Sequence, residues 1–94
     1  MHTGGFVLPL LKLAGEEPAP LPGWPGLTLA RLRARRAVEA PARRLYLVLE
    51  GELLIDLASG SYLHLHPGDA AQVEEAHTLV PVAQAVVLEW KPSS

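Results

Sequence analysis

The chain has 94 residues, of which 49% are hydrophobic, and its formal net charge is −2. This length supports one compact domain, because chains divide into separate cores only at several times this size. The charge lacks the basicity of a general nucleic-acid binder, and the absence of cysteine excludes disulfides, thiolate zinc sites and cysteine nucleophiles.

The N-terminal part of the chain is rich in proline and glycine. Residues 6–13 are apolar but contain Pro9, which cannot donate to a β-ladder, so they predict either an edge strand or a short turn of helix ending at Gly15. Residues 16–26 include four prolines and two glycines, a composition typical of an extended connector without regular structure. Trp24 is expected to pin this connector to the core.

Residues 27–36 alternate between basic and apolar side chains, which predicts a β-strand. The basic residues are Arg31, Arg33 and Arg35, with Arg36 beside them, and the apolar residues on the opposite face are Ala30, Leu32 and Ala34. Such a basic strip fits either a solvated sheet face or a contact strip for an anion or a nucleic acid. The net charge and the lack of interleaved aromatic residues favour the solvated face.

From residue 44 onward the sequence predicts short strands separated by turns. Residues 44–55 carry a β pattern that Gly51 interrupts, so two strands meeting at a turn or a bulge are expected there. Further strands are expected at residues 61–66, 71–73, 78–82 and 84–90, with a hairpin connection at 56–60 and a tight turn at 67–69. The predicted fold class is all-β, with residues 27–94 forming a β-barrel domain after an N-terminal edge segment and connector at 1–26.

Two short motifs in this region resemble the central hairpin of the cupin family. Residues 48–52 (VLEGE) match the turn after a hydrophobic strand, and residues 65–69 (LHPGD) match the turn that leads to the family's second metal-binding motif. Both turn glycines stand where a positive φ is expected. The resemblance extends over residues 28–88 and implies a cupin-like β-barrel, also described as a double-stranded β-helix or jelly roll.

The same resemblance places residues without ligand atoms at the family's metal positions. Metal-binding cupins use two histidines and a glutamate before the first turn, where this chain has Val38, Ala40 and Arg44. The family's later histidine falls at Leu79, and His77 takes its place if the connecting turn is two residues shorter. Because valine and alanine cannot coordinate and a guanidinium repels a divalent cation, no metal and no cofactor are expected.

Arg44, Tyr46 and His77 are the predicted ligand-binding residues. The resemblance turns Arg44 and Tyr46 toward the barrel interior, and His77 is either a remnant of the second motif at the barrel mouth or an ordinary turn residue. A buried guanidinium needs a partner, because an unpaired charge in a dry site costs several kcal/mol. That partner is either a bound anion or an internal carboxylate, for which the candidates are Glu39, Glu74 and Glu75.

His64 and His66 form a pair that is similar to a metal motif, but they follow the first turn instead of preceding it. Residues two apart on a strand share a face, so the two imidazoles could jointly hold zinc. Leu63 and Leu65 occupy the alternate face and are expected to fill the barrel, which turns both histidines outward. We therefore predict two solvated surface histidines, with a metal site built from His64, His66 and His77 as the alternative.

These observations favour a metal-free cupin-like protein that binds a small anionic molecule or serves as an interaction module, and they disfavour an enzyme. The alternative is a metal-dependent cupin enzyme of the isomerase or dioxygenase type with non-standard histidine ligands. A nucleic-acid-associated regulator depends on the arginine strip alone, so no nucleic-acid partner is predicted. The sequence shows no membrane span and no secretory signal, which predicts a cytoplasmic protein without a membrane partner.

The small size of the chain also predicts self-association. A chain of this length buries only about 60 to 65% of the surface that it exposes when unfolded, so a homodimer is expected. The absence of asparagine and the preference for arginine over lysine are compatible with a thermophilic source.

Overall fold

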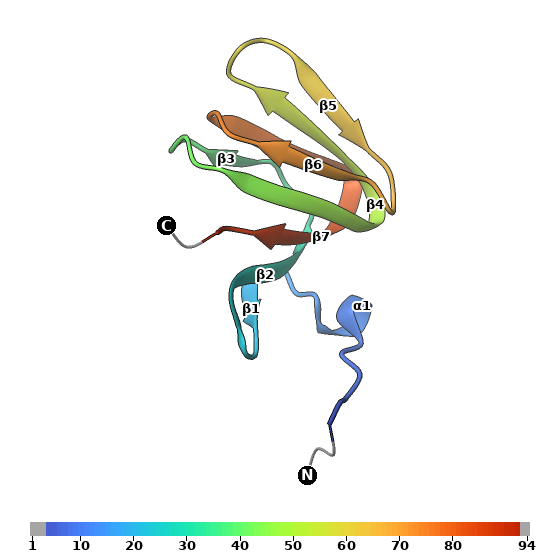
Figure 1. Cartoon of the computed structure of the whole chain (residues 1–94). Helices are drawn as coiled ribbons and strands as arrows, with labels where there is room; N and C mark the ends of the chain where they lie inside the picture. Colours follow the sequence, from blue (N-terminus) through green and yellow to red (C-terminus); the bar gives the residue numbers. More distant parts are fainter. Residues whose placement is uncertain (1–3, 93–94) are drawn as a thin grey trace.

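The computed structural model describes residues 4–92, and these form seven β-strands and one short helix (Figure 1). The helix is α1 (Leu10–Leu13), and the strands are β1 (Ala19–Leu21), β2 (Trp24–Leu32), β3 (Arg36–Val38), β4 (Arg44–Leu57), β5 (Tyr62–Leu65), β6 (Ala70–Val73) and β7 (His77–Trp90). Every strand pairing in this part of the chain is antiparallel. The predicted all-β fold is confirmed.

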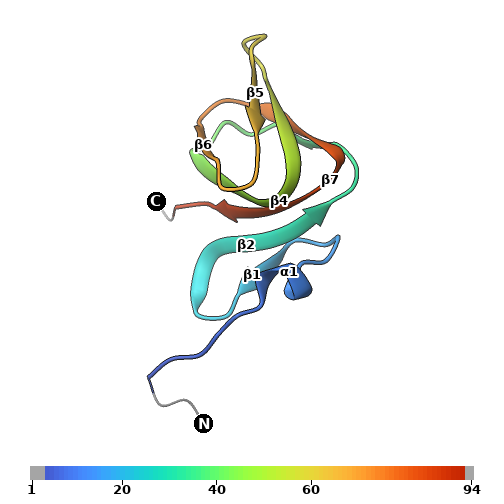
Figure 2. The same ribbon diagram turned by 90° about the vertical axis from the view of Figure 1, so that its right-hand side faces the viewer.

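The two longest strands, β4 and β7, pair with each other along most of their length and form the centre of the sheet. β5 and β6 continue the sheet beyond β4, and β2 and β3 continue it beyond β7. β1 pairs with the outer edge of β2. The sheet curls into a barrel, which Figure 2 shows end-on.

Apolar side chains from alternate positions of the strands fill the barrel. Tyr46 and Val48 from the first half of β4 and Leu53 and Ile55 from its second half have no exposed surface, and Leu79 of β7 is equally buried. Burial of each such side chain contributes roughly 1.5–3 kcal/mol. The period of two within the sequence therefore decides which side chains line the interior and which face outward.

Gly51 interrupts the β pattern with a bulge and not with a turn. The pairing between β4 and β7 shifts register on either side of it. Gly51 has a φ of 81°, and there is also no room for a side chain, because a Cβ would collide with the carbonyl oxygen of Gln84. The expectation of two strands meeting here is wrong, since β4 continues through the bulge. In the same way, residues 78–82 and 84–90 belong to one strand, β7, which passes through Ala83 at a φ of 67°.

The predicted hairpin and tight turn are both present. The Leu57 N–H donates to the carbonyl of Ser61 at 2.9 Å, which closes the connection between β4 and β5. The Asp69 N–H donates to the carbonyl of His66, also at 2.9 Å, and closes the turn before β6. Gly68 in this turn has a φ of 92°, a conformation that favours glycine.

The N-terminal segment contains more regular structure than predicted. Of the two alternatives for residues 6–13, the short helix is present, as α1. Residues 19–21 of the expected connector form β1, so the expectation of a segment without regular structure is wrong. Pro20 is tolerated because β1 is an edge strand. Trp24 is 63% exposed and does not pin the segment to the core. β2 begins at this residue, so the boundary predicted between residues 26 and 27 falls inside a strand.

A second, smaller apolar cluster lies outside the barrel. Leu21 and Leu29 are buried there with Val86, and Leu10 and Ala14 pack against them. Figure 2 shows why this cluster is separate: β1 and α1 lie on the side of β2 that faces away from β4, β5 and β6. In residues 4–92 no helix has the length and apolar character needed to cross a membrane.

The predicted arginine strip is divided because β2 ends before Arg33 and β3 begins only at Arg36. Arg31 pairs with Glu50 at 3.3 Å, and Arg33 pairs with Glu16 at 3.4 Å, both near the surface. These carboxylates neutralise the first two arginines, as the solvated-face interpretation predicts. Arg36 instead points into the barrel, so the strip is not one continuous basic face.

Candidate functional site

Three charged side chains meet inside one end of the barrel, which we call the mouth. Glu89 of β7 is only 5% exposed and accepts two charge-assisted hydrogen bonds. Arg44 Nη1 of β4 donates to Glu89 Oε2 at 2.7 Å, and Arg36 Nη2 of β3 donates to Glu89 Oε1 at 2.9 Å. Both distances are typical of strong pairs between guanidinium and carboxylate groups.

The strand register turns Glu89 inward. Glu89 lies opposite Tyr46 on β4 and opposite Thr28 on β2, and paired residues of an antiparallel sheet project to the same face. Sequence analysis missed this residue. The alternation along β7 could have identified Glu89 as an inward-facing residue. Ala85 and Val87 belong to the barrel interior, and Glu89 follows at the next inward position.

Arg44 therefore has an internal carboxylate partner, but not one of the three that were predicted. Glu39 and Glu74 are exposed, and the Glu75 carboxylate accepts a hydrogen bond from the Ser59 backbone N–H at 2.7 Å. Those three residues belong to loops near the strand ends, whereas Glu89 is brought to Arg44 by pairing between β4 and β7. The general expectation of a buried ion pair stands with a different partner.

A cavity of about 300 Å³ opens at the mouth beside this ion-pair network. Its charged lining consists of Arg36, Arg44 and Lys91, which are cationic, and Glu89, which is anionic. These four charged side chains together give the described lining a net positive charge. Within residues 4–92, the buried Arg44 Nε is a donor without a hydrogen-bond partner. The cavity thus offers positive charge, and one of the guanidinium groups that line it keeps a buried donor unsatisfied.

Tyr46 and His77 form a buried pair on the interior side of β4 and β7. The Tyr46 hydroxyl lies 2.6 Å from His77 Nε2, and His77 Nδ1 lies 2.7 Å from the Glu75 carbonyl oxygen. Because a carbonyl only accepts, Nδ1 carries a proton and donates; in the neutral imidazole, Nε2 then accepts from the tyrosine hydroxyl. Burial raises the pKa of Tyr46 above its ordinary value of 10.0, and the negative charge of Glu89 adds to this effect while Arg44 and Arg36 oppose it.

The three predicted ligand-binding residues consequently do not share one cavity. Arg44 lines the cationic cavity, and Tyr46 has no exposed surface. His77 lines a second cavity of about 300 Å³ that also contains the carboxylates of Glu39 and Asp56. The two cavities flank β3 and differ in charge, so an anionic molecule is favoured only in the one that Arg44 lines.

The residues at the metal positions of the resembled family do not suit a divalent cation. Val38 is buried without any donor atom, Ala40 follows β3 in an exposed bend, and Leu79 belongs to the core. Arg44 contributes a guanidinium that is already paired with Glu89. The nearby groups that could donate, Glu89 and His77, are engaged by two guanidinium groups and by Tyr46 respectively.

His64 and His66 lie on the outer surface of the barrel, as predicted. Both are exposed, while Leu65 between them is 3% exposed and packs inside. His77 points into the barrel and is 5% exposed, so the alternative set of three histidines is not assembled. The carboxylate near the two outer histidines is Glu52, which sequence analysis did not single out.

Comparisons with known proteins give matches only among solved structures. No protein-family model and no curated protein sequence matches the chain. A cupin-2 domain protein from Shewanella frigidimarina aligns at 14% identity over 82% of this chain and 80% of its own, with a TM-score of 0.69. A cupin superfamily protein from Desulfitobacterium hafniense aligns at 18% identity over 83% and 77%, with a TM-score of 0.66.

An iron-containing enzyme is also among the structural neighbours. The Fe(II) form of HppE in complex with its substrate aligns at 17% identity over 72% of this chain and 47% of its own, with a TM-score of 0.57. At such identities the likeness concerns the fold, and the site residues have to be compared on their own chemistry.

Proposed function

The chain has the cupin fold, and from that premise we propose that it is a metal-independent binding protein for a small anion held at the mouth. The observation that carries the proposal is the cavity lining, in which the cations of Arg36, Arg44 and Lys91 outnumber the single carboxylate of Glu89. A guanidinium pair and an ammonium suit carboxylate or phosphate groups, because hydrogen bonds to these anions are charge-assisted.

The ion-pair network fixes the positions of the two arginines and leaves some of their hydrogen-bond donors for a ligand. Glu89 binds one guanidinium nitrogen of Arg44 and one of Arg36, so the other N–H groups of both guanidinium groups do not bind this carboxylate. The Arg44 side chain is 15% exposed and that of Arg36 is 32% exposed. An anion at the mouth therefore meets one largely desolvated guanidinium and a second, more accessible one.

The size of the cavity limits the class of ligand. About 300 Å³ lies at the lower end of the range for small-molecule sites. A small dicarboxylate or a compact phosphate compound fits this volume, whereas a nucleotide or an extended peptide exceeds it. The aliphatic side chains of Ala37 and Val38 line the same cavity and provide limited apolar contact.

A metal-dependent isomerase or dioxygenase is less compatible with this geometry. In that alternative, His64, His66 and His77 supply ligands, but His77 faces the interior while the other two lie outside. The iron of HppE belongs to that neighbour, and the mouth of this chain presents cations where a metal would need donors.

The proposal is tested by calorimetry and thermal shift with inorganic phosphate and with succinate, using sodium chloride at matched ionic strength as the salt control. We expect saturable stabilisation of the wild type. Arg36→Gln and Lys91→Gln should each weaken binding about tenfold or more, since a hydrogen bond to a charged group contributes roughly 1.5–3 kcal/mol. Arg33→Gln, which removes a surface cation outside the mouth, should bind as the wild type does.

Two results would reject the proposal. One is stabilisation by phosphate and succinate no greater than that by chloride. The other is equal binding by wild type, Arg36→Gln and Lys91→Gln, because the anion would then bind away from the mouth. A cytoplasmic location, a homodimer and the absence of a nucleic-acid partner stay predictions from the sequence.

A further inference from the structure

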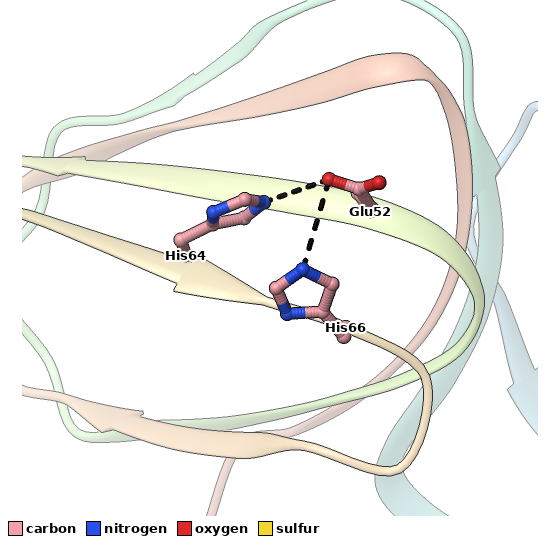
Figure 3. Close-up of side chains that lie close together, drawn as sticks. All are labelled: Glu52, His64 and His66. Atoms are coloured by element: carbon pink, nitrogen blue, oxygen red, sulfur yellow. Dashed lines mark hydrogen bonds and ion pairs between the residues drawn. The ribbon is translucent and has the colours of Figure 1, made fainter.

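We propose that Glu52, His64 and His66 form a binding site for a divalent transition metal ion, with Zn²⁺ as the ion of choice, on the outer wall of the barrel. The three side chains converge in Figure 3, with Glu52 on β4, His64 on β5 and His66 directly after β5. One potential ligand atom of each residue lies within 4.8 Å of the others. This outer site is separate from the mouth and does not depend on the proposed anion binding.

The strand register builds the outer site. Leu54 lies opposite His64 and Leu53 lies opposite Leu65, so continuing the register by one position places Glu52 opposite His66. Leu53 and Leu65 point into the core, which turns the residues on either side of them outward. His64 and His66 are two apart on one face, and Glu52 is their cross-strand neighbour.

The distances match the span of a bound ion. With zinc bonds of about 2.0–2.2 Å, two ligand atoms on a tetrahedral ion lie about 3.3 Å apart. Glu52 Oε2 lies 2.8 Å from His64 Nε2 and 3.9 Å from His66 Nε2, values on either side of that separation. Small side-chain rotations are sufficient to bring the three atoms to one ion, because all three side chains are partly exposed at this surface.

The chemistry of the donors selects the class of ion. Two imidazoles and one carboxylate suit Zn²⁺ and its neighbours in the first transition row better than Ca²⁺ or Mg²⁺, which prefer oxygen ligands. Three protein ligands leave a fourth position open to solvent, as in zinc sites that retain a water. The single carboxylate offsets half of the charge of the ion.

A second carboxylate lies close to one of the imidazoles. His66 Nδ1 faces Asp69 Oδ2 at 3.7 Å, which leaves Nε2 directed toward Glu52. The same Asp69 oxygen accepts a hydrogen bond from the His66 backbone N–H at 2.9 Å, so the tight turn holds this carboxylate in place. Histidine ligands of metals commonly donate their opposite ring nitrogen to a carboxylate, and Asp69 lies near that nitrogen but beyond hydrogen-bond distance. The imidazoles of His64 and His66 also lie close together, with centroids 4.4 Å apart and ring planes inclined by 37°.

The test is isothermal titration of the full, tag-free chain with ZnCl₂ after treatment with a chelator. We expect a stoichiometry near one Zn²⁺ per chain. His64→Ala, His66→Ala and Glu52→Gln should each weaken binding at least tenfold, with the fold retained by circular dichroism because the three side chains are at the surface. Glu74→Gln removes an exposed carboxylate directly after β6, which is not part of the outer site, and should bind Zn²⁺ as the wild type does.

A spectroscopic measurement identifies the ligands independently. Zn²⁺ should shift the imidazole resonances of His64 and His66 in a two-dimensional NMR spectrum, and leave those of His77 unchanged. Binding of wild-type affinity in the double variant His64→Ala/His66→Ala, or loss of binding in Glu74→Gln, would overturn the proposal. So would the absence of any saturable binding by the wild type. None of these three outcomes bears on phosphate or succinate binding at the mouth.

Discussion

Replacement of Glu89 by glutamine tests the ion-pair network at the mouth. Glu89→Gln keeps the shape of the side chain but removes the charge that Arg44 and Arg36 share. Both guanidinium groups then face each other without a counterion, one 15% and the other 32% exposed. Breaking a buried ion pair costs about 3–5 kcal/mol. Since solvent screens the more exposed arginine, we expect a loss near the lower limit, about 3 kcal/mol.

Urea unfolding followed by circular dichroism measures this loss. For a domain of this size, about 3 kcal/mol corresponds to a fall in Tm of roughly 12–24 °C. The matched control is Glu50→Gln, which removes the half-exposed partner of Arg31. A surface pair of this kind contributes under about 1 kcal/mol. If Glu89→Gln lost no more stability than Glu50→Gln, the account of a buried network at the mouth would be refuted.

Two further predictions concern the bulge and the buried tyrosine. Gly51→Ala should lower the free energy of unfolding by well over about 1 kcal/mol, because a Cβ would collide with Gln84. Gly60→Ala is the control, since Gly60 also has a positive φ but has open space around it, and it should cost only about 1 kcal/mol. Similar Tm values for the two variants would contradict the collision. For Tyr46, the pKa in the folded state lies above its ordinary value, so its contribution to stability is complete below about pH 10 and is lost as the pH rises toward the folded-state pKa. The wild type should therefore lose more stability between pH 9 and pH 11 than Tyr46→Phe, as measured by urea unfolding at each pH, and equal slopes would count against a raised pKa.

Local patterns in the sequence are sufficient for several features of the fold. Alternation identified the strands, and the turns at residues 56–60 and 67–69 followed from their glycine, proline and aspartate content, because these preferences act within a few residues. Alternation also placed His64 and His66 outside, since Leu63 and Leu65 claim the interior. Glycine is favoured in both turns and bulges, so the local sequence at Gly51 left the two alternatives open.

The features that the sequence did not reveal depend on contacts between distant segments. Nothing near Arg44 indicates that its partner is Glu89, because that contact exists only when β4 and β7 pair in register. The Pro-rich connector became part of the sheet because β2 offers it an edge. Likewise, Glu52 joins the two outer histidines only through the pairing of β4 with β5.

The sequence by itself thus determined that the chain forms short strands with an apolar inner face, and it located the turns at residues 56–60 and 67–69, because these properties follow from a period of two and from the conformational preferences of single residues. Only the tertiary structure decided which inward-facing charges meet and which outward-facing donors converge. The reason is physical: an ion pair or a set of ligands requires atoms within a few ångström of one another, and in this barrel that proximity is produced by strand register.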